Sequence, residues 1–81
     1  MRPGLITGTN VDAVDIAAGM KFAAEFGYTS PEHQLVAEYA LARWARGEED
    51  GAVQTFLSEG FSLTDVYAII AHAVAQNQRM E

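Results

Sequence analysis

Apolar residues recur every three or four positions along most of the chain, and this spacing is typical of amphipathic α-helices. Four such stretches are separated by short segments that contain glycine. We expect helices over about residues 11–26, 31–46, 50–59 and 63–77. The pattern therefore predicts a small all-α domain of four helices.

Residues at the expected helix boundaries support these limits. Asn10 is a candidate N-cap for the first helix, and Ser30 precedes a proline at the first position of the second. Ser62 with Asp65 three residues later matches a capping box for the fourth helix, and Phe61 before the cap suits a hydrophobic staple. A glycine suited to a left-handed C-cap follows each of the first three helices: Gly27, Gly47 and Gly60.

Each helix is expected to turn one apolar face toward a shared core. On the first two helices this face consists of Val11, Val14, Ala18, Phe22, Leu35, Val36, Tyr39, Ala40 and Trp44. On the last two it consists of Val53, Phe56, Leu57, Val66, Ile69, Ile70, Ala73 and Asn77. The opposite, exposed face of the fourth helix is expected to carry Asp65, Ala68, His72 and Gln76. Gly19 either weakens the first helix or permits close packing.

The organisation of the chain predicts one domain with an irregular N-terminal arm. Residues 1–9 are rich in proline, glycine and threonine and are expected to form the arm, while residues 10–81 form a single helical domain. One shift carries Gly27-Tyr28-Thr29 onto Gly60-Phe61-Ser62. This echo indicates two helical hairpins. The alternative is that both junctions use the same turn chemistry.

The charge balance changes the expected partners. Eleven acidic residues against five basic ones give a formal net charge of −6, which repels phosphate and favours a protein partner with a basic surface. Only Arg43 and Arg46 form a local basic pair, so direct nucleic-acid binding is not expected. The first residues lack the apolar run of a secretory signal, and no segment approaches the roughly 18 apolar residues that cross a bilayer, so we expect no membrane association and a cytoplasmic location.

Candidate chemistry is sparse. The chain has no cysteine, which excludes disulfides, thiolate nucleophiles and the usual thiolate zinc sites. His33 and His72 lie on different helices without a second ligand at helical spacing, so we expect no metal and no other cofactor. Ser30 and Ser62 are explained as caps, and no histidine is expected close enough to activate either one. We therefore expect no catalytic residue and no enzyme. A small enzyme subunit that uses His33, His72 and Asp65 is a further alternative.

Aromatic and basic residues gather toward the end of the second helix. Tyr39, Arg43, Trp44 and Arg46 belong to the residue types that dominate protein–protein hot spots. A mixed aromatic and basic edge on an acidic body gives a partner an anchor and an orientation, so we expect these four residues to bind a protein partner. The alternative is that Trp44 fills the core and the arginines cap the helix.

Hydrophobic residues make up 49% of the chain, more than helices this short fully cover. These observations favour a non-enzymatic, acidic protein-interaction module. It would act as a regulatory adaptor, or as an inhibitor of a larger protein machine of the kind that phages encode. A second hypothesis is a structural subunit of a homo-oligomer or particle, in which the N-terminal arm contacts a neighbouring subunit.

Overall fold

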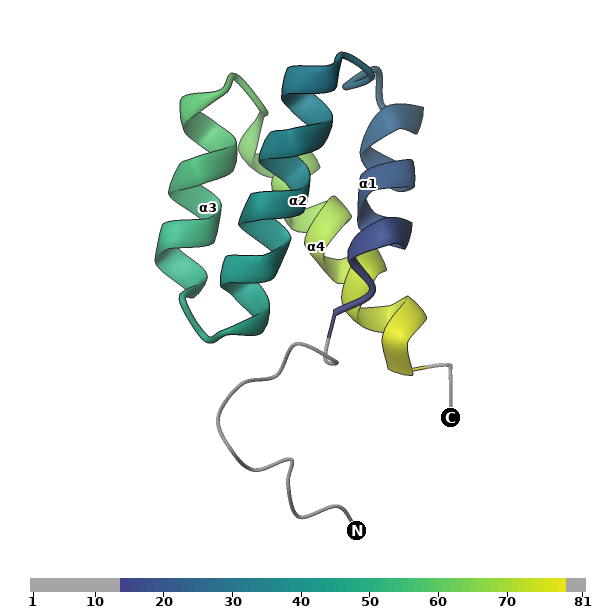
Figure 1. Ribbon diagram of the computed structural model, residues 1–81, viewed down its shortest axis with the longest axis vertical. Helices are drawn as coiled ribbons and strands as arrows, with labels where there is room; N and C mark the ends of the chain where they lie inside the picture. Colours follow the sequence, from purple (N-terminus) through teal and green to yellow (C-terminus); the bar gives the residue numbers. More distant parts are fainter. Residues whose placement is uncertain (1–13, 79–81) are drawn as a thin grey trace, which may run out of the picture.

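The computed structural model describes residues 14–78, and this part of the chain forms four α-helices without strands. Their bounds are Ile16–Glu25 (α1), Pro31–Ala45 (α2), Glu49–Ser58 (α3) and Leu63–Gln78 (α4). In Figure 1, α1, α2 and α3 lie side by side in one layer, and α4 crosses behind them. The all-α prediction is confirmed. None of the described helices combines the length and hydrophobicity needed to cross a membrane.

α1 begins later than the sequence pattern predicts. Its N-cap is Asp15, whose Oδ1 accepts a hydrogen bond from the N–H of Ala18 at 3.0 Å, and Val14 before it is not helical. The N–H of Asp15 also donates to the carbonyl of Ala73 on α4 at 3.0 Å. Aspartate and asparagine are equally good caps, so the pattern alone chose the earlier residue. That residue, Asn10, lies outside the described range, as do the arm at residues 1–9 and residues 79–81.

The predicted caps of α2 and α4 are confirmed. Ser30 Oγ accepts a hydrogen bond from the N–H of His33 at 3.1 Å. Ser62 Oγ accepts one from the N–H of Asp65, also at 3.1 Å. α3 begins at Glu49, one residue before the predicted start, and has no side-chain cap. The acidic residues in its first turn interact favourably with the positive end of the helix dipole instead.

The first three helices end in the same way. Each is followed by a glycine with positive φ, namely Gly27 (104°), Gly47 (91°) and Gly60 (92°). The N–H of the next residue then donates to a carbonyl five residues back, as in a Schellman motif. These bonds join Tyr28 to Ala23 at 3.1 Å, Glu48 to Arg43 at 2.9 Å and Phe61 to Phe56 at 3.3 Å. The predicted glycine stops are therefore confirmed.

The core receives side chains from all four helices, and its largest fully buried members are Phe56, Leu41, Ile69 and Val66. On α2 the buried residues are Ala37, Ala40, Leu41 and Ala45. Leu35 and Tyr39, which were expected on the core face, are 64% and 57% exposed, so this part of the prediction is wrong. Alanines allow neighbouring helices to approach α2 closely, and Leu41 is the one large side chain among its buried residues.

Gly19 lies on the side of α1 that faces Leu41 of α2 and Ala73 of α4. A Cβ added at this buried position would stand 2.5 Å from Leu41 Cδ1 and 3.1 Å from Ala73 Cβ. Both distances are shorter than ordinary van der Waals contact, so a larger residue requires the Leu41 side chain to move and Ala73 to shift slightly. Of the two explanations offered by the sequence, close packing is the correct one.

The predicted core face of α4 is confirmed for the described side chains, since Val66, Ile69, Ile70 and Ala73 are buried. The opposite face is not the exposed one. Its members, Asp65, Ala68, His72 and Gln76, are half-buried. Asp65 bonds to Tyr28 and His72 stacks on Phe22, so this side of the helix meets α1 and the turn after it. The exposed residues are Leu63, Thr64, Tyr67, Ala71 and Ala75. The Asn77 side chain lies outside the description.

The two-hairpin arrangement is not confirmed. α1 packs against both α2 and α4, α2 also packs along α3, and α3 shares a smaller contact with α4. The echo in sequence does correspond to similar local structure, because both junctions use a positive-φ glycine. The aromatic residues that follow the two glycines, Tyr28 and Phe61, stack on each other with ring centroids 3.9 Å apart.

Candidate interaction surfaces

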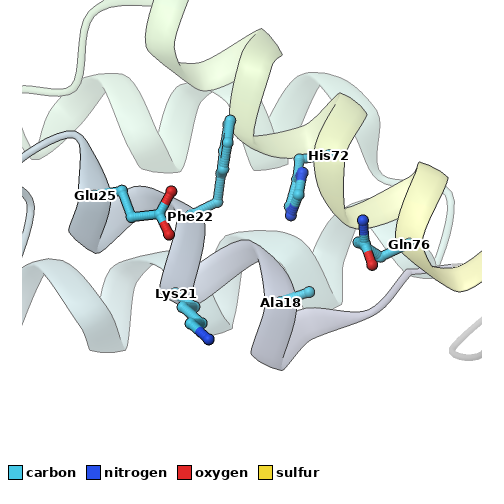
Figure 2. A pocket seen from close by; sticks show the side chains of 6 residues that line it. All are labelled: Ala18, Lys21, Phe22, Glu25, His72 and Gln76. Carbon is cyan, nitrogen blue, oxygen red and sulfur yellow. The ribbon is translucent and has the colours of Figure 1, made fainter.

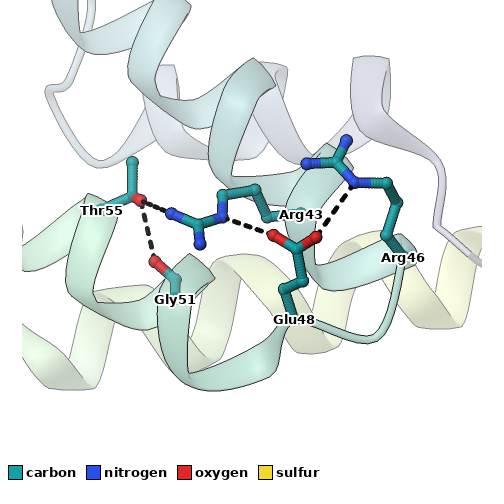
Figure 3. A network of polar contacts seen from close by, with 5 residues as sticks. All are labelled: Arg43, Arg46, Glu48, Gly51 and Thr55. Carbon is teal, nitrogen blue, oxygen red and sulfur yellow. Dashed lines mark hydrogen bonds and ion pairs between the residues drawn. The ribbon is translucent and has the colours of Figure 1, made fainter.

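Arg43 and Arg46 converge on one carboxylate at the turn between α2 and α3 (Figure 3). Arg43 Nε donates to Glu48 Oε1 at 2.9 Å, and Arg46 Nε donates to Glu48 Oε2 at 3.4 Å. Arg43 Nη1 donates to Thr55 Oγ1 at 3.3 Å, and the Thr55 hydroxyl donates to the Gly51 carbonyl at 2.8 Å. These bonds from Arg43, and then from Arg46, hold the pKa of Glu48 below its usual value. Two positive charges thus share one negative charge.

Gly51 makes room for the Arg43 guanidinium to lie across the start of α3. A Cβ added at Gly51 would collide with Arg43 Nη2 and stand 2.7 Å from Arg43 Cζ. Nothing local in the sequence pattern links this glycine to an arginine on the preceding helix. The glycine therefore sets the position of one predicted site residue.

Tyr39, Arg43 and Arg46 belong to one outward surface, which we call the α2 face and define as Glu32, Leu35, Tyr39, Arg43 and Arg46. Arg43 Cζ lies over the Tyr39 ring, 5.8 Å from its centroid, which is within cation–π range. Leu35 stands one helical turn before Tyr39. Beside Leu35, a shallow pocket of about 400 Å³ is lined by Glu32, Leu35, Val36 and Glu59.

Trp44 belongs to a different surface, although it follows Arg43 directly in sequence. It is half-buried, packs on the core and borders a shallow groove of about 500 Å³ along α4. We call this groove the α4 face and define it as Trp44, Tyr67, Ile70, Ala71, Val74 and Ala75. Consecutive residues on a helix point about 100° apart. The four predicted partner-binding residues therefore divide between two faces and do not form one patch.

A third hollow, of about 350 Å³, lies between α1 and α4 (Figure 2). The Phe22 ring and the His72 imidazole stack almost parallel, with centroids 4.1 Å apart and an interplanar angle of 8°. Ala18, Lys21, Glu25 and Gln76 complete the lining. The Phe22 and His72 rings join α1 to α4 at this hollow. The His72 ring therefore takes part in the packing of α4 against α1.

Two hydrogen bonds join the Tyr28 side chain to the start of α4. The Tyr28 hydroxyl donates to Asp65 Oδ2 at 2.7 Å and accepts from the N–H of Ser62 at 3.3 Å. In an ordinary capping box, the Asp65 carboxylate would accept directly from the Ser62 N–H. Here the Tyr28 hydroxyl lies between the two groups and completes the box. The bond to Asp65 raises the pKa of Tyr28 above its usual value of 10.0.

Ser30 and His33 form a pair that the sequence argument missed. Ser30 Oγ lies 3.0 Å from His33 Nδ1, so the expectation that no histidine approaches a capping serine is wrong. The His33 ring packs edge-on against Tyr28 and Phe61, with centroids 5.3 Å away in both cases, and hydrogen-bonds to no carboxylate within residues 14–78. An activated serine requires a base that a third group orients. In the same range, no three His, Asp or Glu side chains gather closely enough to hold a metal ion.

Comparison with known proteins leaves the surfaces as the basis for a function. No protein-family model, no curated protein and no solved structure matches the chain. Two surfaces of residues 14–78 remain as candidates: the α2 face, with charges at both ends, and the α4 face, which is uncharged.

Proposed function

We propose that the chain is a small, acidic, non-enzymatic protein-interaction module whose α2 face binds a basic, amphipathic segment of a partner protein. The observation that carries this proposal is the exposure of Leu35 and Tyr39, 64% and 57%. These are the two most exposed large apolar side chains of the described residues, and they lie one turn apart on the same helix face. Apolar residues at this spacing fit the anchors of an amphipathic helix.

Charge favours a basic partner. Glu32 and Glu59 border the pocket beside Leu35, and neither forms an ion pair within residues 14–78. Lysine or arginine side chains that flank an apolar anchor would meet these carboxylates. At the other end of the face, Arg43 and Arg46 share a single carboxylate. The face therefore has an acidic and a basic end, and this asymmetry favours one orientation of the bound segment.

Such a module acts by occupying a surface of its partner, either as a regulatory adaptor or as an inhibitor of a larger protein machine of the phage-encoded kind. A basic groove that normally holds nucleic acid is one target that an acidic body with an apolar anchor suits. The cytoplasm is the proposed location. The alternative is a structural subunit of a homo-oligomer or particle whose N-terminal arm contacts a neighbouring subunit, and that arm lies outside the described residues.

A lysine-rich amphipathic helical peptide with a leucine stripe is the direct probe, and its counterpart with every lysine replaced by glutamate is the charge control. We expect binding of the basic peptide, measured by fluorescence anisotropy, to weaken with added salt. Tyr39→Ala should weaken it about tenfold, which corresponds to ~1.4 kcal/mol. Tyr67→Ala is the matched control, because Tyr67 is 52% exposed but lies on the α4 face. Equal binding of both peptides, or equal losses for both tyrosine variants, would contradict the proposal.

Two further variants test the ends of the α2 face separately. Glu32→Gln should reduce the salt dependence of peptide binding without removing the apolar contact. Gly51→Ala should displace the Arg43 guanidinium while keeping its charge. Because alanine also favours helix, this variant should keep its fold, so any change in affinity reports the position of Arg43 alone.

A further inference from the structure

α4 differs from the other helices in the charge of its exposed side. Exposed carboxylates occur on α1 (Glu25), on α2 (Glu32 and Glu38) and on α3 (Glu49 and Asp50). On α4, residues 63–76 contain one charged side chain, Asp65, which is half-buried and bonded to Tyr28. The outward residues of α4 are therefore uncharged from Leu63 to Gln76.

This difference decides which occupant the α4 face suits. Each copy of the chain carries a net charge of −6, so two copies repel when their acidic faces approach. A contact through the α4 face brings together two surfaces whose own residues carry no carboxylate. An apolar groove of about 500 Å³ with a tryptophan and a tyrosine at its border supplies the attraction.

The order of large and small residues on α4 is self-complementary. Tyr67, Ala71 and Ala75 follow one another at intervals of one helical turn on the exposed side. If a second α4 runs antiparallel with the two-fold axis at Ala71, each Tyr67 lies opposite Ala75 of the second copy. A large residue then meets a small one twice, and two alanines meet on the axis, where they allow close approach.

We propose that the α4 face binds a second copy of this chain, in an antiparallel, two-fold symmetric contact centred on Ala71. The helix has 16 residues, which gives a length of about 24 Å. One helix side of that length covers a few hundred Å² per copy, less than the roughly 800 Å² that each partner of a standard interface buries. The dimer is therefore weak, in the micromolar range or above, and depends on protein concentration.

Salt separates this contact from binding at the α2 face. Screening removes the repulsion between two acidic bodies, so added salt strengthens the dimer, whereas it weakens the attraction of a basic partner to the α2 face. Trp44 is the only tryptophan of the chain and borders the groove. Its fluorescence emission should therefore shift to shorter wavelength as the dimer forms.

The test is sedimentation velocity of the full chain over a range of concentrations at low and high salt. Ala71→Glu places two like charges on the axis and should raise the dissociation constant at least tenfold. Ala17→Glu is the matched control, because Ala17 is exposed on α1 and the substitution adds the same charge. Mixing Ala71→Glu with Ala71→Lys copies should restore the dimer, since opposite charges then face each other across the axis.

Three results would overturn the proposal. The first is a chain that stays monomeric at the highest soluble concentration in high salt. The second is a dimer that responds equally to the substitutions at Ala71 and Ala17, or that mixing fails to restore. The third is a monomer whose α4 face takes up the basic peptide, detected as a loss of peptide binding in Tyr67→Ala. Circular dichroism of each variant identifies any loss of fold.

Discussion

The two ends of the helical layer close their turns with the same backbone motif but with different residues after the glycine. At one end, Tyr28 and Phe61 follow Gly27 and Gly60, and their rings stack between helices that are far apart in sequence. At the other end, Glu48 follows Gly47 and pairs with arginines of the helix that has just ended. Figure 1 shows the α1–α2 and α3–α4 turns at the top and the α2–α3 turn at the bottom.

This difference predicts that the aromatic end contributes mainly to stability and the charged end mainly to partner binding. At the aromatic end, Tyr28, His33 and Phe61 are in mutual contact, Phe56 packs against Phe61, and Phe61 is only 3% exposed. The charged end contains exposed side chains whose ion pairs contribute little to stability in water. Its arginines and the adjoining Tyr39 are accessible to a partner. We therefore expect variants of the aromatic end to change the free energy of unfolding, and variants of the charged end to change affinity.

The largest effect should come from Phe61→Ala. Removing this buried ring leaves a cavity beside Phe56 and Tyr28 and should lower the free energy of unfolding by about 3–5 kcal/mol. A domain of this size has roughly 4–12 kcal/mol in total. Urea denaturation measures the change. Phe26→Ala is the control, because Phe26 is 42% exposed and should lose about 1 kcal/mol. Similar losses in both variants would remove the distinction between the ends.

Tyr28→Phe should lower the free energy of unfolding by about 1–2 kcal/mol, because it removes the bond to Asp65 and leaves the Ser62 N–H without its partner. The raised pKa of Tyr28 favours the protonated hydroxyl in the folded state. This contribution is complete below the usual tyrosine pKa of 10.0 and is lost as pH rises through the folded value. The difference between wild type and variant should therefore shrink in alkaline solution. Denaturation at neutral and alkaline pH, with Tyr39→Phe as the control, measures it.

Ser62→Ala should lower the free energy of unfolding by about 1 kcal/mol through loss of the α4 cap. Ser58→Ala is the matched control, since the Ser58 hydroxyl is exposed and only donates to the Thr55 carbonyl within α3. Thermal denaturation distinguishes the two variants. Equal melting temperatures would show that the hydrogen bonds of the Tyr28 hydroxyl stabilise the start of α4 without the Ser62 cap.

The smallest effect should come from Glu48→Gln, at the charged end. The depressed pKa of Glu48 means that its ion pairs stabilise the fold above the usual glutamate pKa of 4.5, and that this contribution is lost as pH falls through the folded value. The exposure of this carboxylate to solvent keeps the contribution small. Melting temperatures of wild type and variant should differ slightly at neutral pH and converge in acid. A loss as large as that of Ser62→Ala would contradict the comparison.

Local signals predicted most of the helix boundaries, whereas packing decided the orientation of α2. Serine caps and glycine stops act within a few residues, so Ser30, Ser62 and Gly60 could be recognised from sequence. Alanines have no strong preference for core or surface in an apolar pattern, so the pattern assigned Leu35 and Tyr39 to the core. The buried side is made instead by four small or medium residues that let α1 and α3 approach.

The candidate site was predicted only in part. The contact between Tyr39 and Arg43 follows from one-turn spacing and could be expected. The separation of Trp44 from Arg43 also follows from helix geometry, but the choice of a single cluster overlooked it. Gly51 on α3 leaves space for the Arg43 side chain of α2, and the sequence pattern of neither helix indicates this contact. That residue was found only through packing.

The hydrogen bond between the Asp15 N–H and the Ala73 carbonyl has a consequence for synthesis on the ribosome. The beginning of α1 is tied to a residue near the end of the described chain, and α4 supplies Val66, Ile69, Ile70 and Ala73 to the core. The first three helices therefore emerge without the partner that covers them. Folding is completed only after translation has passed α4, so a nascent chain stalled before that point presents its apolar residues to chaperones and proteases.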